Sequence, residues 1–171
     1  MAGDADSFGQ LYDKYIDKVY RHLYYRTGNA TEAEDLAAQV FLKAWNAMGR
    51  YRPMGRPFGG WLLSIGHNLL IDHYRAHKVS TSLEDVIIPA GDSADPVLLA
   101  EKSFASASLR HAIKQLKRDQ QAVVVMRYIN GLDYSEIAQA LGKSEGAVRV
   151  ILHRSLLALR KIVGRETGDV S

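Results

Sequence analysis

The chain has 171 residues, of which 47% are hydrophobic and 24% charged, with a formal net charge of +3, as in a globular protein of one or two small domains. It contains no cysteine, which excludes disulfides and thiolate metal sites and fits a reducing compartment. The sequence also lacks the apolar run of an export signal or a membrane span, so we expect a cytoplasmic protein without membrane insertion.

The first 78 residues are dense in apolar residues at helical spacing. Between residues 8 and 23 they follow the i, i+3, i+4, i+7 pattern of one long amphipathic helix. Residues 28–31 interrupt this pattern, and Thr31 followed by Glu34 has the spacing of a capping box. A second helix is therefore predicted to start at Thr31.

The second helix carries two aromatic residues, Phe41 and Trp45, four positions apart on its apolar side. Residues at this spacing lie on one helix face, so both are expected in the core. The stretch 49–60 is rich in glycine and proline and is predicted to be a loop. A third helix is predicted from about residue 61 to residue 77.

Residues 79–97 are rich in Ser, Pro and Gly and show no sustained periodicity. This stretch holds four acidic residues and no Lys or Arg; the acids are Glu84, Asp85, Asp92 and Asp95. A flexible acidic linker is therefore predicted.

The second half is again helical and is more basic than the first. Helices are predicted over residues 98–116 and 119–130. Residues 101–165 hold twelve basic residues against five acidic ones. Such a surplus suggests a polyanionic partner, because phosphate contacts supply most non-specific affinity for nucleic acid. The alternative is a charge that serves only solubility.

Residues 131–161 are predicted to form a helix-turn-helix. Asp133 and Glu136 have capping-box spacing ahead of a short apolar set. Gly142 then supplies a tight turn, and Ser144 can cap a second helix. In such a unit the two helices bury their apolar faces against each other, and the start of the second stays free for the major groove of DNA.

The second helix of this unit has an outward face of polar and charged residues, namely Glu145, Arg149, His153 and Arg154. A basic outward face is typical of DNA-binding helices, although an ordinary helical hairpin with a solvated face shares the pattern. Arginine at such a position pairs with a guanine edge or with phosphate, and the sequence leaves both open.

The same helix is unusually apolar because of four residues, Val150, Ile151, Leu156 and Leu157. We interpret them as packing residues. The alternative is that they form a surface that binds a partner protein or the first 78 residues of the chain.

Two segments carry a specific resemblance, namely TEAEDLAAQVFLKAWNAM from Thr31 and FGGWLLSIGHNLLIDHYRAHK from Phe58 to Lys78. They resemble the second conserved region of extracytoplasmic-function (ECF, group 4) RNA polymerase sigma factors, whose fourth region is a helix-turn-helix. The resemblance implies an all-α fold of two small helical domains joined by a flexible acidic linker. The implied boundaries are 1–78 for region 2, 79–97 for the linker, 98–165 for region 4 and 166–171 for a tail.

The resemblance also implies three sets of contact residues. Those facing the clamp coiled coil of the largest polymerase subunit are Asp35, Leu36, Gln39 and Lys43. Those facing the unpaired minus-ten strand are Arg56, Asn68, His73, Arg75, His77 and Lys78. Those facing the minus-thirty-five element are Ser144, Glu145, Arg149, His153 and Arg154.

The function implied by the resemblance is that of a non-catalytic specificity subunit, which recognises promoter DNA and captures one strand. Its partners would be core RNA polymerase, through the clamp and the flap, promoter DNA, and an anti-sigma protein. No cofactor is implied. A helix-turn-helix regulator that is not a polymerase subunit is the alternative.

A metal site is not expected. His73 and His77 stand four residues apart, at which two histidines on one helix face can share a metal ion. The sequence assigns them no third ligand, and it lacks the glutamate of an HEXXH motif.

Overall fold

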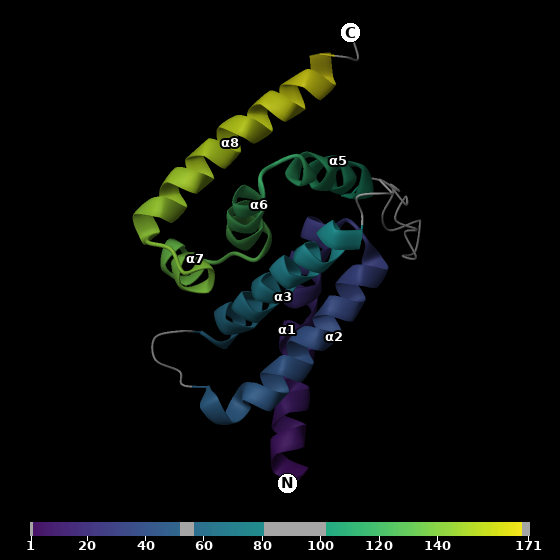
Figure 1. Cartoon of the computed structure of the whole chain (residues 1–171), viewed down its shortest axis with the longest axis vertical. Helices are drawn as coiled ribbons and strands as arrows, with labels where there is room; N and C mark the ends of the chain where they lie inside the picture. Colours follow the sequence, from purple (N-terminus) through teal and green to yellow (C-terminus); the bar gives the residue numbers. More distant parts are fainter. Residues whose placement is uncertain (1, 52–56, 81–101, 169–171) are drawn as a thin grey trace.

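The computed structural model describes residues 2–51, 57–80 and 102–168, and within these ranges the chain is helical with no strand (Figure 1). The all-α expectation is therefore confirmed. None of the helices in these ranges is both long and apolar enough to cross a membrane.

Within residues 2–51 and 57–80, the first half forms three long helices and one short turn of 3₁₀ helix. In chain order these are α1 (Ala2–Thr27), α2 (Ala30–Ala47), η1 (Met48–Arg50) and α3 (Phe58–Ser80). Both α1 and α3 contact α2, and they also contact each other. The third helix starts three residues before the predicted position and runs two residues into the predicted linker. The rest of that linker lies outside the described residues.

The turn before α2 differs from the prediction. Asn29, rather than Thr31, caps the helix, because its extended backbone lets the side-chain oxygen accept a hydrogen bond from the Glu32 amide at 3.0 Å. Gly28 precedes it with a φ of +68°, a conformation that favours glycine. The predicted capping box of Thr31 and Glu34 is wrong because α2 has already begun at Ala30.

The described residues of the second half form four α-helices and a π-helical turn. In chain order these are α5 (Lys102–Lys114), α6 (Arg118–Val124), η2 (Val125–Ile129), α7 (Tyr134–Leu141) and α8 (Glu145–Gly168). The predicted helix 119–130 is therefore an α-helix only to Val124, after which it widens to π geometry. Figure 1 shows α5 and α6 between α3 and the long α8.

The helix-turn-helix is confirmed in detail. The Asp133 carboxylate accepts from the Glu136 amide at 2.8 Å, and Glu136 reaches back to the Asp133 amide at 3.4 Å. Gly142 ends α7 with a φ of +65°, and the Ser144 hydroxyl accepts from the Ala147 amide at 3.1 Å. Val148 is buried, so α8 packs back on α7 as predicted.

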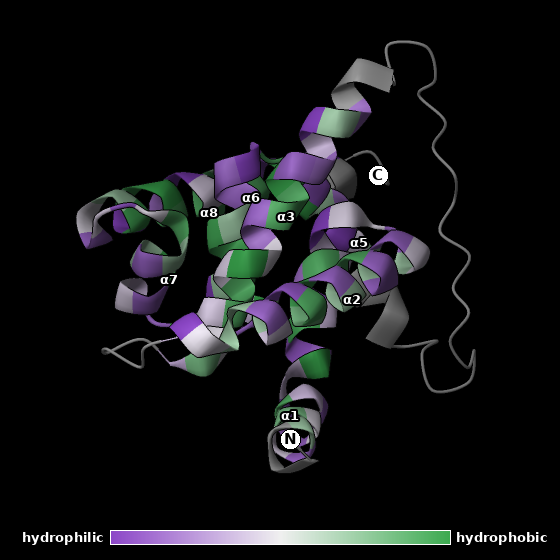
Figure 2. Cartoon of the chain, turned by 60° about the horizontal axis from the view of Figure 1, so that its bottom comes forward, coloured by the Kyte–Doolittle hydropathy of each residue, from purple (hydrophilic) through white to green (hydrophobic). Residues whose placement is uncertain are grey.

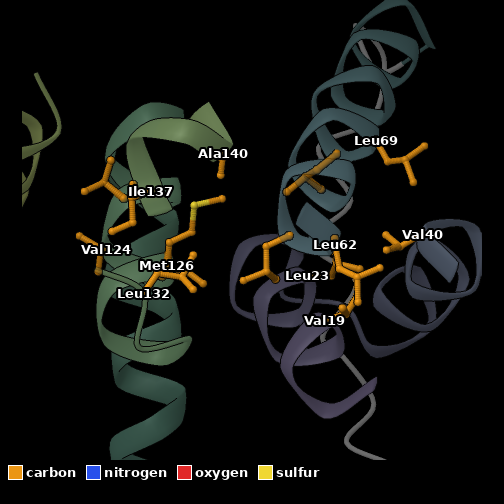
Figure 3. Close-up of a cluster of buried hydrophobic side chains, with 14 of the residues drawn as sticks. Val19, Leu23, Val40, Leu62, Leu69, Val124, Met126, Leu132, Ile137 and Ala140 are labelled. Carbon is orange, nitrogen blue, oxygen red and sulfur yellow. The ribbon is translucent and has the colours of Figure 1, made fainter. Parts of the chain in front are cut away.

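The core runs through both halves of the chain. Figure 3 shows one group of buried side chains from the first half, including Leu23 and Leu62, and a second from the second half, including Met126 and Ile137. Most labelled helices carry both hydrophobic and polar residues along their length, as expected of helices that bury one face (Figure 2).

The two halves pack directly against each other. Helix α3 contacts α7, and α1 contacts both α5 and η2. Asn130 lies buried at this junction, where its amide donates to the Lys18 carbonyl at 3.0 Å and its oxygen lies 3.0 Å from Nδ1 of His22. Lys114 adds a hydrogen bond to the Thr27 carbonyl at 2.9 Å. The described halves thus form one compact body.

Candidate polymerase and promoter surfaces

Helix α2 presents a stripe of exposed polar side chains. Asp35, Gln39 and Lys43 follow one another at four-residue spacing, and all three are exposed. Leu36 is only 3% exposed and packs in the core, so its side chain does not share this surface. The structure therefore brings together three of the four residues expected to contact polymerase.

A leucine that the sequence analysis missed lies beside this stripe. Leu42 is 62% exposed, and seven residues from Asp35 it lies on nearly the same side of α2. Apolar anchors surrounded by polar groups are common at protein interfaces. An apolar residue at the position of Leu42, where the helical pattern demands a polar one, was the signal available in the sequence.

The two aromatic residues of α2 have different environments. Phe41 is buried, as predicted. Trp45 is 44% exposed, so the prediction that it lies in the core is wrong. Its ring packs edge-on against Phe8 with centroids 4.9 Å apart.

Helix α3 carries the residues expected to face the minus-ten strand, and it divides them between two sides. Asn68 and Arg75 are seven residues apart, close to two full helical turns, so they share an exposed face. His73 and His77 are turned away from Asn68 by roughly 140° and 180° about the helix axis. Arg56 lies outside the described residues, as does the side chain of Lys78.

A hollow of about 290 Å³ lies on the Asn68 side of α3. Its lining combines polar and apolar groups from α2, η1 and α3, namely Lys43, Asn46, Ala47, Arg50, Trp61 and Ile65. Asn68 lies one turn beyond Ile65 on the same face. An apolar floor with a nearby cation and amide is suited to hold a flat, hydrogen-bonding ring.

The start of α8 presents the residues expected to face the minus-thirty-five element. All five are exposed, namely Ser144, Glu145, Arg149, His153 and Arg154. Glu145, Arg149 and His153 follow at four-residue spacing and therefore share one face. The Ser144 hydroxyl already serves as the helix cap.

Arg149 is held in place by an aromatic ring. Its guanidinium lies 4.3 Å from the centroid of Tyr134, and that of Arg127 lies 4.7 Å from the same centroid. Such cation–π contacts leave the edge of the guanidinium free to donate hydrogen bonds. The first residue of α7 thus positions a cation at the exposed start of α8.

Further along α8 the apolar residues are mostly uncovered. Val150, Leu156 and Leu157 are exposed, and only Ile151 is partly buried against the core. The interpretation of these residues as packing residues is wrong for three of the four. Val150 and Leu157 lie on the side of α8 opposite to the buried Val148 and Leu152, whereas Leu156 lies at the edge of the buried face.

The junction between the halves encloses the side chains of one arginine and two histidines. Arg26 is buried and donates to Nδ1 of His67 at 2.8 Å, and its Nη1 lies 3.5 Å from Nε2 of His22. Burial lowers the pKa of Arg26 to about 10. Burial, and then the charge of Arg26, lower the pKa of His67 to about 4 and that of His22 well below its usual value.

Both halves of the chain match described families. The family model of sigma-70 region 2 matches residues 11–79, and that of sigma-70 region 4 matches residues 106–159. The region 2 match covers the helices that carry the α2 and α3 surfaces, and the region 4 match covers the start of α8.

Curated relatives match over nearly the whole chain. SigW of Bacillus subtilis, an ECF RNA polymerase sigma factor, is 34% identical over 93% of this chain and 90% of its own length. BldN of Streptomyces coelicolor, another ECF sigma factor, is 35% identical over 95% of this chain, which spans 62% of BldN.

Two solved structures share the fold. CnrH, in complex with the cytosolic domain of CnrY, has a TM-score of 0.73 at 23% identity, over 96% of this chain and 92% of its own. The sigma factor RpoE of Bartonella quintana, in complex with the anti-sigma factor NepR, has a TM-score of 0.72 at 19% identity. That match covers 92% of this chain and 97% of RpoE.

Proposed function

The chain belongs to the ECF family of RNA polymerase sigma factors, and we propose that it directs core polymerase to specific promoters and starts transcription there. In this function the chain supplies recognition, and the catalytic chemistry belongs to the polymerase. The observation that carries the proposal is the match of both sigma regions, in order, to the two halves that bear the exposed surfaces.

The exposed stripe of α2 is proposed to dock on the clamp coiled coil of the largest polymerase subunit. Asp35, Gln39 and Lys43 supply donors and acceptors, and Leu42 supplies an apolar contact. Charged and polar groups at the edge of an interface set its orientation, while a desolvated apolar group adds affinity.

The Asn68 face of α3 is proposed to capture the unpaired minus-ten strand. An amide can both donate to and accept from a base edge, and Arg75 on the same face can pair with phosphate. The hollow beside Trp61 and Ile65 gives an unstacked base a place to lie. His73 and His77 are less suited to this strand because they lie on another side of the helix.

The start of α8 is proposed to enter the major groove of the minus-thirty-five element. Arg149 and His153 face outward on one side, and the stacking of Arg149 on Tyr134 reduces the conformational freedom that it loses on binding. Arg154 lies next to this face and can reach the phosphate backbone.

Promoter binding requires the two halves to separate. The two promoter elements lie about 25 base pairs apart, which is roughly 85 Å of duplex at 3.4 Å per pair. A compact chain of this length has a radius of gyration of only roughly 15 Å. The 21 residues between Ser80 and Lys102 can span at most about 70 Å, enough to let the halves move apart. The compact form is therefore proposed to be the resting form.

An anti-sigma protein is the proposed partner of the resting form. CnrH and RpoE, which share this fold, were solved with the cytosolic domain of CnrY and with the anti-sigma factor NepR. The exposed apolar residues of α8 offer a surface for such a partner.

Run-off transcription with purified chain, core polymerase and genomic DNA fragments tests the proposed function. Discrete start sites that appear only when both proteins are present are the expected result. Absence of polymerase binding and of start sites would refute it. Specific duplex binding by the chain alone, without polymerase, would favour the helix-turn-helix regulator instead.

A further inference from the structure

Three side chains with metal-binding atoms meet where the start of α2 lies against the later turns of α3. Glu32 belongs to the first turn of α2, and His73 and His77 follow at four-residue spacing on α3. One ligand atom from each of the three lies within 4.8 Å of the others. Oε2 of Glu32 is 3.6 Å from Nε2 of His73. The fold thus supplies the third ligand that sequence spacing does not reveal.

Hydrogen bonding prepares one histidine for coordination. Nδ1 of His77 lies 3.2 Å from the carbonyl oxygen of His73, and a carbonyl oxygen can only accept, so Nδ1 carries the proton. Nε2 of His77 then carries the lone pair. A backbone carbonyl that holds the other ring nitrogen is the usual support of a metal-bound histidine, because it fixes the tautomer and the ring.

The two imidazole rings lie close together, with centroids 4.1 Å apart. Together with the Glu32 carboxylate they form a nitrogen and oxygen donor set of the kind that Zn²⁺ takes. Glu32 and His73 are half-buried and His77 is exposed, so an ion can reach the cluster from solvent.

The cluster is separate from the proposed DNA surface. His73 and His77 lie on a different side of α3 from Asn68, as their positions along the helix require. A metal bound here would join the start of α2 to the later turns of α3 without occupying the Asn68 face.

We propose that Glu32, His73 and His77 form a binding site for a divalent transition-metal ion, with Zn²⁺ as the best match. Three protein ligands leave one tetrahedral position for water, as in sites that are not fully closed by protein. The ion would stabilise the packing of α2 on α3, because it binds the folded arrangement and not the unfolded chain.

Titration of the metal-free full chain with Zn²⁺, in competition with a fluorescent zinc chelator, tests this proposal. We expect one ion per chain, and a loss of affinity of about tenfold or more in Glu32→Gln, His73→Ala and His77→Ala. His153→Ala, which removes an exposed histidine from α8, is the matched control and should bind zinc as the original chain does. Co²⁺ should give the absorption spectrum of a tetrahedral site in the original chain and in His153→Ala, and not in the three ligand variants.

Thermal unfolding is a second measurement, and it also shows whether each variant is folded. Zinc should raise the melting temperature of the original chain and of His153→Ala, and at the same zinc concentration it should raise that of Glu32→Gln less. Equal zinc affinity in the original chain and in all three ligand variants would overturn the proposal, as would a stoichiometry far below one. Neither measurement uses DNA or polymerase, so such a result would leave the proposed function untouched.

Discussion

Arg26 is a buried cation at the junction of the two halves, and no ion pair to it is found in the described ranges. Its Nη1 donates to His67, while its Nε and Nη2 have no hydrogen-bond partner there. Because arginine only donates, Nδ1 of His67 must accept and the ring stays neutral. Two further positive charges, on His67 and His22, would be costly at this site.

The stability of the chain should therefore fall as the pH is lowered from about 6.5 toward about 4. Both histidines have a pKa in the folded chain below that in the unfolded chain, and that of His67 is about 4. In this pH window the unfolded chain therefore binds protons that the folded chain does not bind. Each histidine can contribute a loss of up to about 2 kcal/mol between pH 7 and pH 5. Urea unfolding at the two pH values measures it.

A matched pair of variants separates this effect from general acid destabilisation. His67→Asn keeps an acceptor for Arg26 but cannot titrate, so it should lose less stability between pH 7 and pH 5 than the original chain. His153→Asn changes an exposed histidine and should lose as much as the original chain. Equal losses in all three proteins would show that His67 does not govern the acid response.

Asn68 is the residue on which strand capture chiefly depends in this account. Replacing it by alanine should lower open-complex formation about five- to a hundredfold, because a good amide contact to a base is worth about 1–3 kcal/mol. Gln115→Ala, which removes an exposed amide from the other half, is the control. Permanganate footprinting of the melted strand measures the effect, and a co-purification assay should show unchanged core binding. Normal melting in Asn68→Ala would remove this residue from the proposed strand surface.

At the scale of elements, local signals predicted the helix-turn-helix well. The capping box of Asp133 and Glu136 and the glycine turn at Gly142 depend on residues close in sequence, and both are present. The start of α2 was misplaced because Asn29 and Thr31 are both good caps, and only the backbone conformation selects between them. The prediction that Trp45 lies in the core was wrong because helical periodicity indicates the face of the helix on which a residue lies and not how deeply it is buried.

Contacts between distant elements left no trace in the sequence. His22 and Asn130 are 108 residues apart, and the sequence predicted Asn130 only as the last residue of the helix over residues 119–130. Glu32 and His73 meet for the same reason, since only the packing of α2 on α3 joins them. The division of the α3 residues between two faces follows from helix geometry and was available from their spacing alone.

The contact of η2 with α1 should depend on Asn130. Alanine at this position leaves Nδ1 of His22 and the Lys18 carbonyl without their partner inside the junction, which costs about 1–3 kcal/mol. Asn130→Ala should therefore lower the urea midpoint and increase the radius of gyration measured by X-ray scattering. Asn46→Ala, at an exposed amide, should change neither. A variant at Asn130 as stable and as compact as the original chain would show that this hydrogen-bonded contact does not hold the halves together.

At the scale of the whole molecule, the compact form and the proposed function set opposing requirements. The core and the Asn130 hydrogen bonds hold the two halves together, whereas two promoter elements roughly 85 Å apart require them to separate. Arg26 is buried and incompletely paired, and a buried cation of this kind makes the fold less stable than apolar packing would. The junction is thus suited to open when polymerase and DNA offer better contacts.

The distance between the halves in the free chain and in the promoter complex tests this account most directly. The chain has no cysteine, so Asp13→Cys on α1 and Arg160→Cys on α8, both at exposed positions, can carry a donor and an acceptor dye. Energy transfer should be efficient in the free chain and fall sharply once core polymerase and a promoter found by run-off transcription are added. Transcription from that promoter with unchanged energy transfer would contradict the account.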